Sequence, residues 1–539
     1  MNKSLLATAL AGLLAVAAPA AEAVDIRLIN LDTGLGLGLD DPAPRAPVGG
    51  NNGTTLGQQR LVAYQYAADL WSAVLAGNTP VRVTASFQPL ACTPTGGTLA
   101  SAGALSVLRD YTGAIPGTWY HVALAKGMLG QDVNAPAGND IQTRFNGDIG
   151  VNPNCLTGSD WYYGLDGNTP AGQINFLNVV MHEIGHGLGF SGFENVTTGA
   201  LFSGFPSIYA NFSRDNTLGL GVRDMNNTQR AAAFINDGNL VWTGPRVTSE
   251  AALLLDRALV LRATAPAGIA GNEYEVAPGA FGGPVAVGTL AGNVVLADSG
   301  GATGSQGCTA FVNAAQVAGN VALVDRGTCP FVDKARNAQA AGATGVLMAN
   351  NVAGLLSPGG AAPDVTIPVV GITLAAGTEL RNAASPAVAL ATSNSRLQGA
   401  DASGRVLLYA PLARAPGSTY SHFDVRLTPN ALMEPFNTAS LRANLTLDLT
   451  PALFADEGWP LDTGNARIGT CDTLVPMQGT GGLVVGAAVV AQSRACSLGA
   501  PNREAYVACM GAYANELLAD GLIDTRQAGQ IARCAVRQR

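Results

Sequence analysis

The segment of residues 179–190, with the sequence VVMHEIGHGLGF, constrains the chain most, because it holds two histidines and a glutamate at fixed offsets. A mostly apolar run over residues 174–181 leads into it and predicts a buried helix. On an α-helix each residue turns about 100°, so His182 and His186 lie about 40° apart on one face. Both imidazoles can therefore reach one metal ion. Glu183 lies about 100° round from His182, where a carboxylate can take a proton from a water on that ion.

The spacing of these three residues is H-E-x-x-H, which is typical of zinc peptidases. A chance match on a helix with ordinary surface or core histidines is the alternative interpretation, since patterns with three fixed positions recur by accident. The whole chain has only 4 histidines, so a histidine-rich composition does not explain two of them in this pattern. The sequence therefore predicts a metal site on this helix.

A catalytic zinc site usually has three protein ligands and one open position, so a third ligand must come from elsewhere in the chain. The longer metzincin pattern, H-E-x-x-H-x-x-G-x-x-H, is met as far as Gly189, which we expect to end the helix in a left-handed turn. The pattern then fails, because Gly192 stands where the third histidine should be. The remaining candidates for the third ligand are Glu194, Glu250, His121 and His422.

His422 is the strongest of these candidates because of the residues that follow it. Met433 lies just downstream in the turn-forming segment ALMEP, which resembles the Met-turn beneath the metal of metzincins. The combination of HEIGHGLGF, a long insertion, SHF and ALMEP resembles the leishmanolysin-like metzincins. This resemblance implies one catalytic zinc ion, with Glu183 as the general base and Met433 in the supporting turn. It also implies three zinc ligands: His182, His186 and His422.

The gap between His186 and His422 is long enough to hold a whole domain. Between residues 258 and 395 the composition shifts to alanine, glycine and valine with few charges. The centre of this insertion reads as strand, loop, helix and strand, with Ala335 and Ala338 on the helix face that would pack on a sheet. The segments VDRGTCPF, KARNAQAAGA and TIPVVGIT resemble the protease-associated (PA) domain. A lid, a substrate-positioning module and a spacer all remain open as roles for it.

The rest of the chain reads as an α/β domain around this insertion. Apolar spacing predicts a strand at DIRLIN, a helix at LGQQRLVAYQYAADLWSAVLAG and a strand at TPVRVTASF, and residues 139–175 are expected to supply an edge strand. The predicted fold is a metzincin-like α/β catalytic domain with a mixed sheet and an active-site helix, interrupted by an α/β PA-like domain and followed by a small helical, disulfide-bonded tail. The expected boundaries are 1–23 for a signal peptide, 24–257 and 396–465 for the two catalytic parts, 258–395 for the insertion and 466–539 for the tail.

The N-terminal segment predicts secretion. It has one lysine, an apolar run and a small-residue end near Ala23, which is the layout of a cleaved signal peptide. No later apolar run reaches the length of a membrane span, so no membrane anchor is expected. The net charge of -8 and the lack of a basic cluster argue against nucleic acid as a partner.

The cysteines fit a secreted protein. There are 8 of them, an even number, with no C-x-x-C pair, so disulfides are the default interpretation. Neighbours along the chain predict two of these: Cys92 with Cys155 and Cys308 with Cys329. In the tail, two helices are expected to form a hairpin at Gly521, which brings Cys509, 12 residues before it, level with Cys534, 13 residues after it. This arrangement predicts a disulfide between Cys509 and Cys534, which leaves Cys471 to pair with Cys496.

These features together predict a secreted zinc-dependent endopeptidase acting on proteins or peptides, in which Glu183 activates the attacking water. Two alternatives remain. One is an inactive protein-binding module on the same fold, against which the intact Glu183 argues. The other is a zinc peptidase with a glutamate as third ligand. A structural Ca2+ ion near Asp40 and Asp41 is a weaker expectation than a solvated acidic loop.

Overall fold

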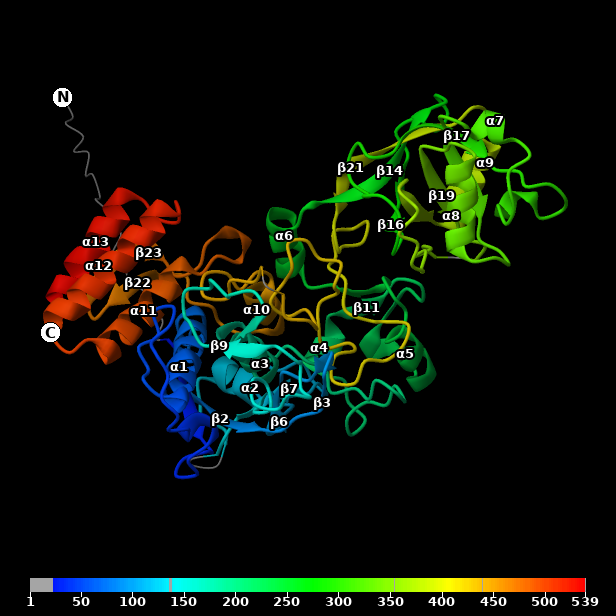
Figure 1. Ribbon diagram of the computed structural model, residues 1–539. Coiled ribbons are helices and arrows are strands. Elements are labelled where there is room, and N and C mark those ends of the chain that lie inside the picture. The colour runs from blue at the N-terminus through cyan, green and yellow to red at the C-terminus, as the bar shows by residue number, and fades with distance from the viewer. Residues whose placement is uncertain (1–22, 135–137, 353, 439, 539) are drawn as a thin grey trace, which may run out of the picture. The chain divides into compact units, whose positions relative to one another are not determined.

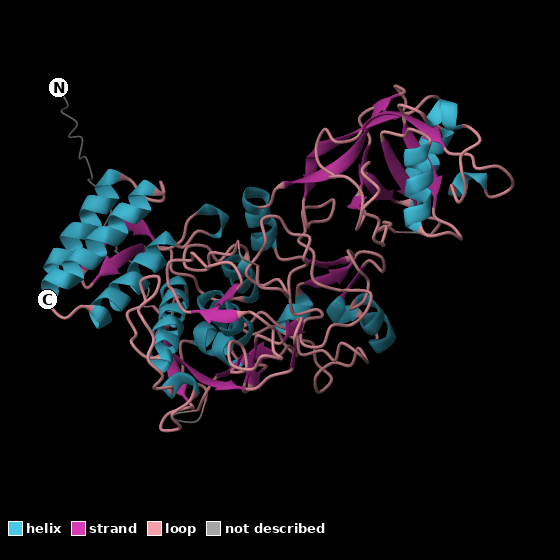
Figure 2. Cartoon of the chain, viewed as in Figure 1, coloured by secondary structure: helices cyan, strands magenta, loops and turns pink. Residues whose placement is uncertain are grey.

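The computed structural model describes residues 23–134, 138–352, 354–438 and 440–538 (Figure 1). The predicted signal peptide lies outside the described residues, apart from Ala23. Contacts along the backbone divide the chain into two compact units. Unit 1 comprises Met1–Leu254, Arg405–Val425 and Asn430–Arg539, and unit 2 comprises Leu255–Gly404 and Arg426–Pro429. Helices and strands occur in both units, so the fold is mixed α/β as predicted (Figure 2).

Unit 1 contains a four-stranded sheet in the order β1-β2-β8-β5. Strands β1 (Asp25–Asn30) and β2 (Pro80–Gln88) occupy the two segments predicted as strands, and β8 (Ile141–Asn146) runs parallel to β2. Strand β5 (Ala100–Ala104) pairs antiparallel with β8. Within residues 139–175, β8 is therefore an inner strand of this sheet and not the predicted edge strand, because the short alanine- and glycine-rich β5 covers its outer side.

Two long helices of unit 1 begin at side-chain caps. The threonine before α1 (Leu56–Val74), Thr55, accepts a hydrogen bond from the N–H of Gln58. The asparagine before α3 (Phe176–Leu188), Asn175, accepts one from the N–H of Asn178. Such caps satisfy a backbone donor that the first turn leaves free. Helix α1 confirms the predicted helix, and α3 carries the H-E-x-x-H segment.

Helix α3 is held closely between α1 and the sheet. The indole N–H of Trp71 on α1 donates to the carbonyl of Met181 on α3 at 3.0 Å. On the sheet side, a Cβ atom added at Gly187 would lie 2.2 Å from the side chain of Ile141 on β8. Only glycine allows this approach, so the sequence of the helix fixes its distance from the sheet.

The other elements of unit 1 that precede unit 2 are short. The helices are α2 (Val122–Leu129), α4 (Ile208–Asn211), α5 (Asn227–Ala233) and α6 (Pro245–Leu254). The strands are β3 (Cys92–Thr93), β4 (Gly96–Gly97), β6 (Val107–Leu108), β7 (Tyr120–His121), β9 (Asp160–Tyr162), β10 (Gln173–Asn175), β11 (Ser213–Asp215), β12 (Leu220–Gly221) and β13 (Leu240–Trp242). Among the described residues, no helix combines the length and the apolar character that a membrane span needs.

The chain ends in helices and one small hairpin. These elements are α10 (Thr450–Glu457), β22 (Asn465–Ile468), β23 (Cys471–Pro476), α11 (Val485–Gly499), α12 (Arg503–Ala519) and α13 (Thr525–Arg537). The disulfides here are Cys471–Cys534 and Cys496–Cys509. The two pairs predicted for the tail are therefore wrong.

The reason for this error is that α12 and α13 do not direct their cysteines at each other. Cys534 on α13 lies against β23, where its sulfur is 3.4 Å from the carbonyl oxygen of Asp472. Cys509 on α12 instead meets α11, where the amide nitrogen of Gln492 lies 3.9 Å from its sulfur. Position along a hairpin did not determine which face each cysteine occupies. The two other predicted disulfides, Cys92–Cys155 and Cys308–Cys329, are confirmed.

Unit 2 is built on an eight-stranded sheet in the order β15-β14-β21-β17-β18-β19-β20-β16. Its strands are β14 (Arg257–Ala265), β15 (Glu273–Glu275), β16 (Ala277–Pro278), β17 (Ala291–Leu296), β18 (Val321–Asp325), β19 (Gly345–Ala349), β20 (Val369–Ile372) and β21 (Ala387–Leu397). Its helices are α7 (Ala314–Val317), α8 (Phe331–Ala340) and α9 (Leu374–Asn382). Strands β17, β18, β19 and β20 form a parallel block, as the strand-helix-strand pattern of the insertion predicts.

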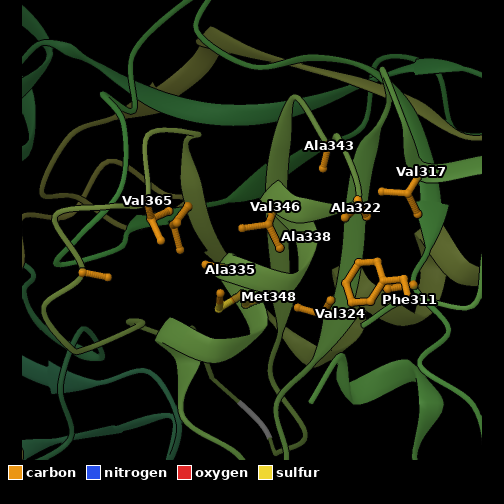
Figure 3. Packing of buried hydrophobic residues seen from close by; sticks show 14 of the residues in the cluster. Phe311, Val317, Ala322, Val324, Ala335, Ala338, Ala343, Val346, Met348 and Val365 are labelled. Atoms are coloured by element: carbon orange, nitrogen blue, oxygen red, sulfur yellow. The ribbon is translucent and has the colours of Figure 1, made fainter. Parts of the chain in front are cut away.

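The core of unit 2 lies on both faces of this parallel block. On one face, Ala335 and Ala338 of α8 pack with Ala322 and Val346 of the sheet (Figure 3). Both alanines are fully buried, which confirms their predicted orientation. Small side chains bring the helix axis close to the strands, so α8 covers the sheet without a large residue between them.

Candidate metal centre

Helix α3 presents two of the predicted ligands to one point. His182 and His186 lie one turn apart, and their Nε2 atoms are 3.0 Å from each other. His182 is partly exposed, while His186 is buried. The local helix geometry alone produces this pair, since residues i and i+4 share a face.

The third imidazole comes from the segment that follows unit 2 in the chain. The Nε2 atom of His422 lies 3.2 Å from the Nε2 atoms of both His182 and His186. The backbone of His422 is held in turn, because its carbonyl accepts a hydrogen bond from the N–H of Tyr409 at 2.9 Å. Of the four candidates for a third ligand, the structure thus brings His422 to the helix.

Each of the three imidazoles uses its other ring nitrogen to hold its orientation. The Nδ1 atom of His182 lies 2.8 Å from the carbonyl oxygen of Leu432. That of His186 lies 2.8 Å from the carbonyl oxygen of Phe190. The Nδ1 atom of His422 lies 2.7 Å from the carbonyl oxygen of Ser418. A carbonyl oxygen only accepts, so each Nδ1 carries the proton and each Nε2 keeps a free lone pair.

The three lone pairs fit a tetrahedral metal ion. Zinc bound at 2.0–2.1 Å to tetrahedrally placed nitrogens would separate those nitrogens by about 3.3 Å. The observed separations are 3.0 and 3.2 Å. Within the described part of the chain, this is the group of three or more potential ligands whose atoms converge closely enough for one ion. The donor set therefore fits a divalent metal with one position left open.

Burial keeps these imidazoles neutral. It lowers the pKa of His182 from its usual 6.5 to about 4 and that of His422 to about 3. The pKa of His186 falls well below 6.5, because of burial first and then of the two neighbouring histidines. A neutral imidazole is the form that binds a metal, so the surroundings favour the ligand state.

Met433 lies beneath this group. It is fully buried, and a Cβ atom at Gly185 of α3 would lie 3.0 Å from its sulfur. The residue before it, Leu432, supplies the carbonyl that holds His182, and the carbonyl of Met433 itself accepts from the N–H of Phe423. The turn therefore joins α3 to the strand-like segment that carries the third histidine, at the position predicted for the supporting turn.

Glu183 lies beside the imidazoles and is 6% exposed. Burial raises the pKa of its carboxyl from 4.5 to about 8. It lines a cleft of about 540 Å³ together with the three histidines. Further walls of the cleft come from other segments: residues 97–102, residues 191–192, residues 416–418 with Ser421, and Leu432 with residues 434–437 and Leu441. The predicted base therefore faces the space into which the free lone pairs point.

Gly189 ends α3, but not in the predicted left-handed turn. Its φ of 161° is extended backbone. Its importance comes instead from a close contact, because a Cβ atom there would lie 2.5 Å from a carboxylate oxygen of Glu457. At Gly192, where a shorter metzincin site would have its third histidine, a Cβ atom would lie 2.3 Å from the ring of Tyr420. No side chain fits at that position, which explains why the third imidazole comes from elsewhere.

The glutamates considered as third ligands have other partners. Both carboxylate oxygens of Glu194 accept hydrogen bonds from Ser207, at 2.8 Å from its N–H and 2.9 Å from its hydroxyl. Glu250 on α6 accepts from the N–H groups of Gly481 and Gly482. Neither belongs to the converging group.

The remaining candidates also lie apart from that group. His121 is fully buried, and its Nε2 atom lies 2.8 Å from the hydroxyl oxygen of Ser191. Asp40 and Asp41 accept hydrogen bonds from the backbone N–H groups of Gly34 and Ala43, as turn-stabilising carboxylates do.

Two parts of the cleft were not foreseen from the sequence. Strand β5 and the residues leading into it form one wall, and Ser191 lies on another. The segment TLASAGALSVL has weak strand signals because its residues are small. Ser191 follows directly on the GLGF end of the motif, and this adjacency was the one available signal for it.

Comparison with characterised proteins finds similarities that cover parts of the chain. Probable lipoprotein aminopeptidase LpqL of Mycobacterium tuberculosis is 39% identical over 82 residues, which are 15% of this chain and 16% of that protein. The zinc aminopeptidase BSAP of Bacillus subtilis is 24% identical over 28% of this chain and 37% of its own, with a TM-score of 0.20. The aminopeptidase of Aneurinibacillus sp. strain AM-1 is 18% identical over 31% of this chain and 39% of its own, with a TM-score of 0.19.

These similarities leave the leishmanolysin-like resemblance of unit 1 as a prediction. The family model of the PA domain matches residues 288–380, which lie inside the predicted insertion. The segments that resembled a PA domain, VDRGTCPF and KARNAQAAGA, fall within the match, and TIPVVGIT does as well. The chain therefore contains a PA domain at residues 288–380.

Proposed function

We propose that this chain is a secreted zinc-dependent endopeptidase. The observation that carries the proposal is the convergence of three imidazole Nε2 atoms beside the carboxyl of Glu183 in one cleft. The similarity to a protein named as an aminopeptidase supports the broader class, a peptidase. The finer assignment rests on the site.

Zinc is the ion that this donor set fits best, because three neutral imidazoles and one open position are typical of catalytic zinc. The residues that would hold it are His182, His186 and His422. When bound there, zinc supplies Lewis-acid chemistry, which polarises a carbonyl group and lets water attack it near neutral pH.

Glu183 supplies the proton transfers. In the metal-free site, burial raises the pKa of its carboxyl from 4.5 to about 8, so once ionised it binds a proton more strongly than an exposed glutamate does. It takes the proton of the attacking water and gives that proton to the amine that leaves when the peptide bond breaks. Glu183 lines the same cleft as the three histidines, so one residue can serve in both steps.

The edge of the sheet supports a peptide as the substrate. Strand β5 pairs with β8 on one side only, and residues 97–102 line the cleft. The free side of an edge strand offers N–H and C=O groups to an extended chain. The alanines and glycine of β5 also leave room for a peptide backbone. A peptide added to this edge would lie along residues 97–102, in the cleft that the imidazoles line.

The acidic residues of the cleft argue against a specific site for a free amino terminus. An aminopeptidase holds the charged amine of its substrate, which calls for a carboxylate besides the base. Among the described residues that line the cleft, the other acid is Glu434. Its oxygens accept hydrogen bonds from the N–H of Ala431 and the amide of Asn430. These hydrogen bonds hold its carboxyl against its own turn.

The four disulfides support export from the cytoplasm, since such bonds persist in oxidising compartments. They agree with the predicted signal peptide. Secretion stays part of the proposal.

The direct test of the function is hydrolysis of casein by the purified protein, with and without a chelator. We expect cleavage that stops on chelation and returns with zinc. Glu183→Ala should lower the rate at least ~100-fold, as loss of a general base does, while the protein keeps its metal. An inactive binding module would give no cleavage in any of these samples, and a rate unaffected by chelation would exclude a metallopeptidase.

The type of peptidase is tested with a quenched fluorescent peptide whose amino terminus is acetylated and whose carboxyl terminus is amidated. An endopeptidase cleaves it at an internal bond, and mass spectrometry identifies the two fragments. An aminopeptidase would leave this peptide intact and release single residues from the matched peptide with a free amine. That second pattern would contradict the endopeptidase assignment and leave the zinc site in place.

A further inference from the structure

His121 and Ser191 form a hydrogen-bonded pair that lies outside the ligand set. His121 ends β7 and is fully buried. Its Nε2 atom lies 2.8 Å from the hydroxyl oxygen of Ser191, a residue 70 positions away in sequence. Its ring packs on Phe193, with the ring centroids 4.5 Å apart. The tertiary structure therefore encloses this imidazole and leaves it one polar contact.

The second ring nitrogen of His121 has no hydrogen-bond partner among the described residues, although it is buried. A buried polar atom without a partner costs free energy that phenylalanine or leucine would avoid. Packing alone therefore does not account for a histidine at this position. Its contact with Ser191 is the feature that an apolar residue would lose.

The unpaired nitrogen also indicates which tautomer His121 adopts. A neutral imidazole has one N–H donor and one acceptor nitrogen. With the proton on Nδ1, a buried N–H group would lack an acceptor, and such orphaned donors are rarer than unpaired acceptors. The favoured tautomer therefore carries its proton on Nε2 and donates to the oxygen of Ser191. This leaves the hydroxyl proton of Ser191 available for another acceptor.

Ser191 stands at the cleft on the side of His186. It is half-buried and lines the cleft with Glu183. The residue before it, Phe190, supplies the carbonyl that fixes the imidazole of His186. In the described part of the chain, the hydroxyl of Ser191 has no partner other than His121. Its proton is therefore free to meet a molecule bound in the cleft.

We propose that the hydroxyl of Ser191 donates a hydrogen bond to a backbone carbonyl oxygen of the bound peptide, and that His121 is the positioning residue that orients it. The inference deepens the proposed peptidase function and rests on it. A peptide offers such an oxygen at every residue, so this contact serves substrates of any side-chain sequence. The contact involves no proton transfer, since the serine remains the donor and the imidazole stays neutral.

The first test replaces Ser191 and measures cleavage of a quenched fluorescent peptide taken from a casein bond that the wild-type protein cuts. Ser191→Ala should lower kcat/KM about tenfold, the effect of one lost hydrogen bond, with unchanged zinc content and thermal midpoint. Ser191→Thr, which keeps the hydroxyl, should recover most of the rate. The matched control is Ser249→Ala, an exposed serine on α6, which should change nothing. A wild-type kcat/KM in Ser191→Ala would overturn the proposal.

A second test asks whether His121 acts through Ser191. His121→Gln places an amide N–H near the position of Nε2 and should keep more activity than His121→Phe, which has no donor. In the Ser191→Ala background, His121→Phe should cause no further loss, because the group it orients is gone. If the losses of activity caused by His121→Phe and Ser191→Ala multiplied in the double variant, His121 would act independently of Ser191, and its positioning role would be overturned.

Nuclear magnetic resonance of the 15N-labelled wild-type protein reads the tautomer without any substitution. The chain has only 4 histidines, so the imidazole region is simple. Three imidazoles should carry the proton on Nδ1, and His121 should carry it on Nε2. The signal of His121 is assigned by its absence from His121→Gln. A proton on Nδ1 of His121 would overturn the proposal whatever the variants do.

The proposed contact of Ser191 can be tested separately from the peptidase function by measuring peptide binding to the Glu183→Ala protein. The anisotropy of a fluorescein-labelled casein peptide, chosen without reference to any cleavage, reports its affinity. Adding Ser191→Ala should weaken binding about tenfold. This loss without any cleavage by the wild-type protein would refute the peptidase function and retain the contact. Cleavage at the wild-type rate by the Ser191→Ala protein would instead refute the contact and retain the peptidase function.

Discussion

Glu183 is the residue at which stability and the proposed chemistry oppose each other. Burial raises the pKa of its carboxyl from 4.5 to about 8, so the metal-free fold holds it protonated at neutral pH. Carboxyl groups perturbed in this way gather at catalytic sites, because a base must have a pKa near the working pH. The cost is a fold that becomes less stable as pH rises.

We predict that Glu183→Gln stabilises the metal-free protein, and more so at high pH. Below about pH 4.5 the carboxyl is protonated in both the folded and the unfolded chain and contributes no difference. Between about pH 4.5 and about pH 8 the unfolded chain ionises and the folded one does not, so the wild type loses stability while glutamine does not titrate. The gain should reach about 2–4 kcal/mol.

Urea unfolding of the two chelated proteins at pH 5 and pH 8 measures this gain. The difference between them should be larger at pH 8. An equal difference at both values would mean that Glu183 is not held protonated in the fold.

At the scale of single residues, the sequence predicted what a helix sets locally. His182, Glu183 and His186 follow from the spacing in one helix. The left-handed turn predicted at Gly189 was wrong. Glycine is required there by a close contact with Glu457, which no local sequence pattern reveals. Ser191 escaped notice for the same reason, since its partner lies 70 residues away.

At the scale of elements, the fit of α3 against the sheet sets where the two helical histidines stand. We predict that Gly187→Ala lowers the free energy of unfolding of unit 1 by about 1–3 kcal/mol and weakens zinc binding. The added methyl group would lie 2.2 Å from the side chain of Ile141, which is fully buried.

The matched control is Gly511→Ala on α12, where a Cβ atom meets nothing within 4 Å. A glycine inside a helix costs free energy that alanine avoids, so this variant should gain about 0.5–1 kcal/mol. Unfolding by urea and zinc affinity compare the two. A Gly187→Ala protein as stable as the wild type would mean that the helix does not lie as close to β8 as the structure shows.

The elements that could be predicted are those in which apolar residues recur at regular helical or strand spacing. Strand β1, helix α1 and strand β2 occupy their predicted segments, and the packing face of α8 is as expected. Strand β5 was missed because alanine and glycine carry no alternation. The predicted pairing of the tail cysteines was wrong because the position of a cysteine along a hairpin does not determine which side of its helix it lies on. That side is determined by the packing of the helices against β23 and α11.

At the scale of the whole molecule, the chain leaves unit 1 after Leu254 and returns to it at Arg405, before the third histidine. All three proposed ligands, the proposed base and the predicted Met-turn therefore belong to unit 1. The PA domain lies entirely within the other unit, and no converging ligand group among the described residues includes it.

We predict that replacing Leu255–Gly404 by a short glycine-serine linker leaves zinc bound. Leu427, which is buried and belongs to unit 2, should be changed to serine in the same protein, because the deletion would expose it. The doubly blocked peptide should be cleaved at a rate close to that of the wild type, while casein cleavage changes if the PA domain acts on access of large substrates. Loss of zinc would show that unit 2 supports the site itself.

The central claim is that three of the 4 histidines bind one zinc ion, and the zinc content of purified variants tests it most directly. The wild type and Glu183→Ala should each hold about one zinc per chain. His422→Ala should lose affinity for zinc more than about 100-fold, beyond the effect of disturbing an outer partner of a ligand. His121→Gln is the matched histidine control and should keep its zinc. A His422→Ala protein that binds zinc as the wild type does would contradict the account.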